Sequence, residues 1–178
     1  EVRWHFDIML KTALLMNKKI KNCFFLVPVN NKLNYEYVRK KIKRYGITNI
    51  KVIFGHSHEV LSCSDISILA SGTASLEAAL LKKPMIIIYR MSWLSWFLLK
   101  PMHLISYVGL PNILLDKFAV PELIQDNAQP NNIAYKAIEL LSDKKYLKEL
   151  KNDFTKLHKE LKRDTSLIII NQIQRYLK

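Results

Sequence analysis

Apolar residues follow two patterns along this chain, and the two patterns alternate. Short runs in which nearly every residue is apolar are typical of strands that helices cover on both faces. They span residues 23–29, 51–55, 66–70 and 85–89. Apolar residues at helical spacing predict helices over most other stretches, namely 1–19, 33–45, 59–64, 73–82, 131–141, 144–162 and 165–176. Because strands and helices alternate, we expect an α/β fold with a parallel, doubly wound, Rossmann-like sheet.

The chain shows no internal boundary. No low-complexity linker interrupts it, so residues 1–178 are expected to form one domain, with residues 106–115 in a loop. A chain of 178 residues buries roughly two thirds of its unfolded surface, and so needs neither disulfides nor metal to hold a core. Cys23 and Cys63 lie in apolar segments, which fits a reducing compartment.

The net charge of +13 is unevenly distributed. Residues 1–60 carry 12 basic and 4 acidic groups, residues 61–140 carry 6 of each, and residues 141–178 carry 10 and 5. Proteins that read nucleic acid concentrate cations on one face and add stacking aromatic residues. We therefore expect no nucleic-acid partner, and attraction to an anionic membrane surface stays open.

The third apolar run leads into Ser71, Gly72 and Thr73, directly before a predicted helix. Ligands of doubly wound sheets bind beyond the carboxyl ends of the strands, where helix N-termini also point. Gly72 would let the backbone approach a ligand, and Thr73 would cap a helix whose free N–H groups accept a phosphate. Glu77 would accept hydrogen bonds from ribose hydroxyls. A plain capped turn, with Glu77 facing the helix dipole, is the alternative interpretation.

Three further positions carry candidate chemistry. Arg90 ends the fourth strand, where it would meet an anion or form a structural ion pair. Asn112 follows a proline, a placement that presents its amide from a constrained turn. Gly55 and His56 close the second strand in a nucleotide-facing loop or an ordinary solvated turn. His56 and His58 lack a third ligand at a clear spacing, so we expect no metal.

Three ordered segments resemble lipid-A-disaccharide synthase, in the carboxyl-terminal half of that family. They are CSDISILASGTASLE (63–77), KPM leading to YRM (83–91) and YVGLPNIL (107–114). Glu1 and Val2 look like the tail of the family's Gly-Ser-Arg motif. The resemblance implies the UDP-sugar-binding half of a GT-B glycosyltransferase that uses no metal or other cofactor. By position, Ser71 to Thr73 would hold the diphosphate and Glu77 the ribose. Asn112 would lie beside the reacting sugar or phosphate, and Arg90 would be a further contact for the anion.

The resemblance also implies a reaction and its partners. The family transfers 2,3-diacylglucosamine from its UDP conjugate (UDP-2,3-diacylglucosamine) to 2,3-diacylglucosamine 1-phosphate (lipid X), which gives the β-1,6 disaccharide of lipid A and UDP. The general base would be an Asp of an amino-terminal, acceptor-binding half that this chain lacks. We expect a cytoplasmic protein that is peripheral on the inner membrane.

The apolar stretch 91–99 is too short to span a membrane. Trp93, Trp96 and Phe97 would rest at the lipid interface or pack against the other half. Two other functions stay open, namely another UDP-sugar GT-B protein (a glycosyltransferase or an epimerase) and a non-catalytic membrane-surface module.

Overall fold

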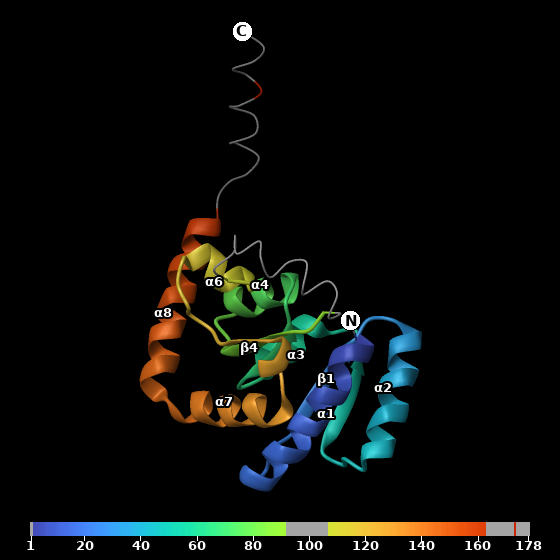
Figure 1. The fold of residues 1–178 in the computed structure, drawn as a ribbon. Helices are drawn as coiled ribbons and strands as arrows, with labels where there is room; N and C mark the ends of the chain where they lie inside the picture. The colour runs from blue at the N-terminus through green and yellow to red at the C-terminus, as the bar shows by residue number, and fades with distance from the viewer. Residues whose placement is uncertain (1, 92–106, 163–172, 174–178) are drawn as a thin grey trace.

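A computed structural model describes residues 2–91, 107–162 and 173 (Figure 1). The strands within these residues are β1 (Phe25–Val29), β2 (Ile50–Phe54), β3 (Ser67–Ala70), β4 (Met85–Tyr89) and β5 (Glu122–Ile124). The helices are α1 (Val2–Lys19), α2 (Lys32–Tyr45), α3 (Ser57–Cys63), α4 (Thr73–Leu80), α6 (Leu110–Leu115), α7 (Pro130–Ser142), α8 (Lys144–Leu161) and the 3-10 helix η2 (Gln125–Asn127). Every strand pair is parallel, so the predicted α/β class is confirmed.

The strands form two hydrogen-bonded sheets, where the sequence led us to expect a single sheet. β1 pairs with β2, while β4 lies between β3 and β5. Within the described residues, no strand pairs with the second edge of β1 or with the second edge of β3. Hydrophobic runs reveal which segments are strands, but they do not show which strand edges meet.

β4 explains why the strands lack polar alternation. Ile86 and Ile88 pack on one face of the sheet with residues of α1 and α7, whereas Met85 and Ile87 pack on the other face with residues of α4 and α8. All four side chains are at most 1% exposed. Burying a side chain of this size contributes about 1.5–3 kcal/mol. A strand that is covered on both faces therefore needs apolar residues at every position.

Helix α1 packs against both sheets. Its residues Ile8 and Met16 belong to the cluster around Ile86 and Ile88 of β4, which also includes α7. Other α1 residues join the cluster of β1 and α2; these are Phe6, Leu10 and Ala13. An ion pair between Asp7 of α1 and Lys41 of α2 also links these two helices. The helix therefore connects the two sheets in one core.

The later part of the chain departs from the sequence prediction. Residues 110–115, expected in a loop, form α6, with Pro111 in the first helical turn, where its missing N–H costs nothing. The three-residue strand β5 was not predicted at all. The apolar stretch 92–99 and the helix expected over 165–176 lie outside the described residues, apart from Ile173. Among the residues described, no helix is both long and apolar enough to cross a bilayer.

Candidate functional site

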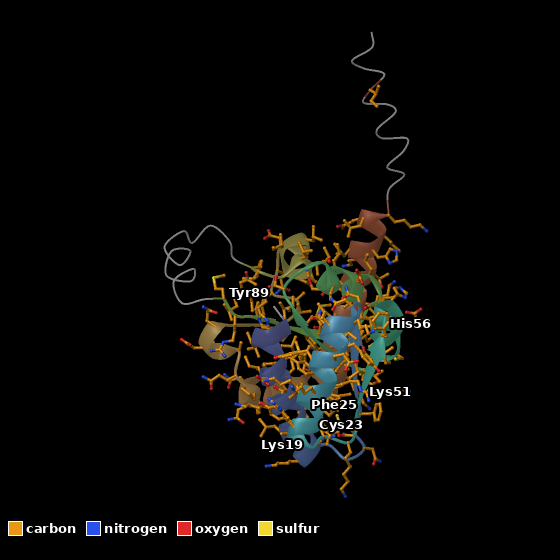
Figure 2. All side chains as sticks on the ribbon, turned by 90° about the vertical axis from the view of Figure 1, so that its right-hand side faces the viewer. Lys19, Cys23, Phe25, Lys51, His56 and Tyr89 are labelled. Atoms are coloured by element: carbon orange, nitrogen blue, oxygen red, sulfur yellow. The ribbon has the colours of Figure 1, made fainter. Side chains whose placement is uncertain are left out.

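The candidate site lies beyond the carboxyl ends of the strands. Figure 2 shows Tyr89, at the end of β4, and His56, just beyond β2, toward one end of the molecule. Cys23 and Phe25, at the start of β1, lie toward the opposite end. The predicted ligand-binding residues that follow β2, β3 and β4 therefore share one edge of the fold.

The turn between β3 and α4 is open on its outer side. Gly72 has φ +157° and ψ −168°, a combination that is essentially restricted to glycine. Apart from its chain neighbours, no described residue has an atom within 4 Å of where a Cβ would stand. Thr73 is not the helix cap that we expected, because Gly72 occupies that position and Thr73 is the first helical residue. The hydroxyl of buried Ser75 donates to the Gly72 carbonyl at 2.6 Å and steadies the turn.

Ser71 uses its hydrogen-bond donors within the fold. Its N–H donates to the Ile88 carbonyl at 3.2 Å, and its hydroxyl donates to the Val108 carbonyl at 2.9 Å. In this arrangement Ser71 supports the turn and has no donor left for a phosphate. The donors left for an anion are the exposed Thr73 hydroxyl and the N–H groups of Thr73 and Ala74 at the start of α4. The next N–H of this turn, that of Ser75, donates to the Gly72 carbonyl at 3.1 Å.

Arg90 lies beside this turn. In the pairing of β3 with β4, Ala70 lies opposite Ile88. Gly72 follows Ala70 by two residues and Arg90 follows Ile88 by two residues, and neighbouring strands lie about 4.8 Å apart. The Arg90 side chain is exposed and forms no ion pair with any described residue, so the structural pairing considered from the sequence is not observed. An unpaired guanidinium next to an open glycine turn favours an anionic ligand.

The main chain around Arg90 is held from two sides. The Arg90 N–H donates to Nε2 of buried His5 at 3.1 Å, and the Met91 N–H donates to Oε1 of Gln125 at 2.9 Å. The Gln125 amide also donates to the Met91 carbonyl at 3.3 Å. Neither His5 nor Gln125 stood out in the sequence, because nothing in the local pattern links them to residue 90.

Glu77 and the Gly55–His56 turn lie at the same edge. Glu77 is exposed on α4, one helical turn after Thr73, and no described residue forms an ion pair with it. Gly55 and His56 have φ values of +70° and +55°, which reverse the chain directly after β2. Nδ1 of His56 lies 3.3 Å from Oε1 of Glu59. A backbone hydrogen bond, followed by the bond from His56, lowers the pKa of the Glu59 carboxyl.

Asn112 does not face a ligand, contrary to our expectation from the sequence. Its side chain is fully buried, and its Nδ2 donates to the Val120 carbonyl and to Oε1 of Glu122, both at 2.8 Å. Its Oδ1 accepts from the N–H groups of Ala119 at 2.9 Å and Val120 at 2.8 Å. These four bonds use both amide donors and both acceptor positions. Asn112 therefore shapes the turn between α6 and β5.

Glu122 is a site residue that sequence reasoning missed. Besides the bond from Asn112, its carboxylate accepts from the N–H of Val108 at 2.8 Å and from the N–H of Gly109 at 2.9 Å. Gly109 fits closely, since a Cβ there would collide with Cδ1 of Ile87. Glu122 therefore fixes the 108–109 turn on the end of the sheet, where Ser71 also binds it. A glutamate in a three-residue strand carries no sequence signal for this role.

The exposed polar groups at this edge suit an anion. Within the described residues, no group of three His, Cys, Asp or Glu side chains is placed to hold a metal ion. The hollow between α2 and β2, lined by Tyr35, Arg39, Lys43 and Lys51 among others, lies away from the Gly72 turn. The Gly72 turn, the Arg90 guanidinium and the Glu77 carboxylate are exposed at this edge.

Comparison with known proteins decides the family. The profile of the lipid-A-disaccharide synthetase family matches residues 1–173. The chain belongs to the lipid-A-disaccharide synthetase family. It is 39% identical over 168 residues to the lipid-A-disaccharide synthase of Methylobacillus flagellatus, covering 93% of this chain and 44% of that protein. It is 41% identical over 173 residues to the synthase of Albidiferax ferrireducens, and the match covers 94% of this chain and 44% of that protein. It is 35% identical over 177 residues to the synthase of Thiobacillus denitrificans, and the match covers 99% of this chain and 47% of that protein. The chain thus spans a little under half the length of these relatives.

In this lipid-A-disaccharide synthetase family member, the segments that carry the resemblance meet at one edge. Ser71 of the first segment binds the backbone of Val108 in the third, and Arg90 of the second follows the neighbouring strand. The three segments therefore form one structural unit around the Gly72 turn.

Proposed function

We propose that this chain is the nucleotide-sugar-binding part of a lipid-A-disaccharide synthase. It would bind UDP-2,3-diacylglucosamine, whose diacylglucosamine is transferred to lipid X to give the β-1,6 disaccharide of lipid A and UDP. The observation that carries the proposal is the open Gly72 turn, with the unpaired Arg90 guanidinium on the neighbouring strand. The diphosphate would lie on the N–H groups at the start of α4 and against Arg90, with the ribose hydroxyls at Glu77.

The chemistry fits this arrangement. When the anomeric bond breaks, negative charge develops on the departing diphosphate, and preorganised donors stabilise it better than reorienting water does. The first turn of α4 supplies such donors together with the positive end of a helix dipole, and Arg90 supplies a full positive charge. The general base and the acceptor site would come from the amino-terminal half of the family, so no base is assigned to this chain.

Membrane association is part of the proposal, because both substrates carry acyl chains. What supports it is a cluster on and just after α6, where Ile113, Leu114 and Phe118 are 43%, 41% and 63% exposed. These side chains follow directly on the turn that Glu122 holds at the site. We propose that they rest on the inner-membrane surface from the cytoplasmic side, next to the acyl chains of the donor.

Calorimetry with UDP and ADP tests the nucleotide site. We expect UDP to bind more tightly than ADP, and Glu77→Ala to weaken UDP binding roughly 10-fold, the loss of about 1.4 kcal/mol expected for a charge-assisted hydrogen bond. Glu149→Ala, which removes an exposed carboxylate on α8, is the matched control and should leave binding unchanged. Equal affinity for UDP and ADP, or equal effects of the two variants, would contradict the proposal.

A second pair of variants tests the turn. Gly72→Ala should abolish measurable UDP binding, since a side chain strains the turn and enters the space beside it. Gly46→Ala is the matched control, because Gly46 also has a positive φ of +65° and open space around it but ends α2. Both variants should lose some stability, and only the first should lose UDP binding.

Sedimentation with vesicles of phosphatidylglycerol and phosphatidylethanolamine tests the membrane contact. The double variant Leu114→Ser, Phe118→Ser should release the protein from the vesicles. Leu33→Ser is the control: it removes an apolar side chain that is 85% exposed on α2, and this variant should stay bound to the vesicles. If both variants bind vesicles like the parent chain, the α6 cluster is not the membrane contact.

A further inference from the structure

We infer that the outer edge of β2, the edge that faces away from β1, binds an extended acidic segment of a partner protein as an added strand. The segment would pair with the main chain of β2, and its carboxylates would face the cations of the hollow between β2 and α2. The inference goes beyond the proposed function, because neither this edge nor this hollow belongs to the Gly72 turn.

The main-chain groups on the outer edge of β2 have no strand beside them. Asn49 and Gly55, which flank the strand, bond to β1 through their carbonyl and N–H groups. Because successive residues of a strand turn their peptide groups to opposite sides, those of Ile50, Val52 and Phe54 face away from β1. Among the described residues, β2 pairs with β1 alone, so these groups are open to a further strand.

The hollow beside this edge is cationic. It has a volume of about 350 Å³, and its lining includes Arg39 and Lys43 of α2 and Lys51 of β2 but no carboxylate. All three cations are exposed, and none of them forms an ion pair with a described residue. Ile42 and Val52 add apolar surface to the lining. The hollow therefore suits a chain that carries both acidic and apolar side chains.

The cations lie on both sides of the open edge. Phe54 meets the ring of Tyr35 of α2 edge-on, with the ring centres 6.1 Å apart, so the side chain of Phe54 faces α2. By the alternation of a strand, Lys51 points to the opposite face and still borders the hollow. An added strand would also send its side chains to both faces in turn. Its acidic residues would meet Arg39 on one face and Lys51 on the other.

The Arg39 side chain is already held beside the hollow. Its guanidinium carbon lies 5.6 Å from the centre of the Tyr35 ring, which is within the range of a cation–π contact. A side chain that is held in place loses less conformational entropy when it binds a carboxylate. Helix α2 also carries six basic residues and one acidic residue, so the field around the hollow is positive.

The open main chain selects a peptide over other anions. The outward groups of β2 are both donors and acceptors, and they repeat every second residue, about 6.6 Å along the strand. An extended peptide has the same groups at the same spacing. The phosphates of nucleic acids and of lipid headgroups offer acceptors only, so they could meet the cations but not pair with the strand.

Charge also selects against a second copy of this chain. Two β2 edges side by side would bring their lysines together, and each chain carries a net charge of +13. Lysine on an exposed edge strand is a common protection against pairing between identical chains. An acidic partner reverses the sign of this interaction. Figure 2 shows Lys51 and His56, near the two ends of β2, along one margin of the molecule.

Hydrogen exchange followed by NMR tests the strand pairing. The probe is a capped peptide of about eight residues in which pairs of glutamates alternate with pairs of valines, so that both faces of the extended chain carry acid. We expect the peptide to slow exchange of the Ile50, Val52 and Phe54 amides by about 10-fold or more. The amides of Lys51 and Ile53 face β1 and should change much less.

Two triple variants with the same change in charge test the role of the cations. One variant removes the cations of the hollow: Arg39→Ala, Lys43→Ala and Lys51→Ala. The matched control removes three exposed cations of α8: Lys145→Ala, Lys148→Ala and Lys151→Ala. The first variant should weaken peptide binding roughly 10-fold, as expected for three exposed ion pairs, and the control less than about 2-fold. Both should fold like the parent chain in circular dichroism, because all six side chains are exposed.

Four further probes separate strand pairing from simple attraction between charges. A peptide of the same sequence that is N-methylated at every backbone nitrogen has no N–H donors and should not bind, nor should a peptide with lysine in place of glutamate. Oligothymidylate and phosphatidylglycerol vesicles should leave exchange of the three outward amides unchanged. The inference is overturned if the glutamate peptide does not bind, if the N-methylated or lysine peptide binds as tightly, or if the two triple variants behave alike. Protection by oligothymidylate or by vesicles would also overturn it, in favour of a nucleic acid or a membrane. No readout uses UDP, so failure here is separate from failure of the proposed function.

Discussion

Asn112→Ala should destabilise the fold at the end of the sheet, and its effect should not be limited to the loss of a ligand contact. The substitution leaves the N–H groups of Ala119 and Val120 without their acceptor, and both residues are at least 93% buried. An unsatisfied buried donor costs about 1–3 kcal/mol. Two such groups, with the lost bonds to Val120 and Glu122, predict a loss of about 3–5 kcal/mol. This is a large part of the roughly 5–15 kcal/mol that stabilises an ordinary domain.

Urea denaturation followed by circular dichroism measures this loss. Asn152→Ala, at an exposed position on α8, is the matched control and should change the free energy of unfolding by less than about 0.5 kcal/mol. Asn112→Asp keeps the acceptor but replaces a hydrogen bond to Glu122 with a second buried carboxylate, so it should also destabilise the fold at neutral pH. The reasoning is refuted if Asn112→Ala is as stable as Asn152→Ala while UDP binding is lost.

Three more changes have calculable outcomes. Gly109→Ala should cost about 1–3 kcal/mol in urea denaturation, since the new methyl overlaps Ile87 in a packed core; unchanged stability would mean that the turn can move. The bond from Lys41 lowers the pKa of Asp7 in the folded chain. The pair therefore stabilises the fold at pH values above the unfolded pKa of about 3.9, and this stabilisation is lost as the pH falls through the lower pKa of the folded chain. The melting temperatures of the parent chain and Asp7→Asn should therefore differ at pH 7 and converge in strong acid. Burial raises the pKa of Tyr146 well above its usual 10. Above about pH 10 only the unfolded chain loses this proton, so the parent chain should lose stability more steeply than Tyr146→Phe.

The parts of the fold that follow from local pattern were predictable. The run 85–89 coincides with β4 residue for residue, because burial on both faces requires apolar side chains at each position. The open turn at Gly72 was also predictable, since a glycine between a strand and a helix has few other uses. Gly46, with φ +65°, ends α2 as its position predicted. In each case the physical cause lies within a few residues of the effect.

The missed features depend on contacts between distant segments. A Pro-Asn pair at the start of a helix has the same sequence whether the amide faces solvent or the interior, and only the position of β5 decides the outcome for Asn112. β5 itself has three residues, too few to show a period of two. The separation into two sheets is likewise invisible in the chain, because the pattern of a strand does not record whether both of its edges are paired.

The roles of Asn112 and Glu122 change how binding and activity measurements that test the proposed function should be interpreted. Glu122 receives three hydrogen bonds, and the turn that it holds is also bound by Ser71, the residue before the Gly72 turn. A variant of Asn112 would displace this turn and thereby shift the donors proposed for the diphosphate. Loss of transferase activity in such a variant would therefore not show contact with the sugar. A true contact predicts activity loss with unchanged stability, whereas the geometry here predicts that activity and stability fall together, and that a compound raising stability without occupying the site would restore part of both.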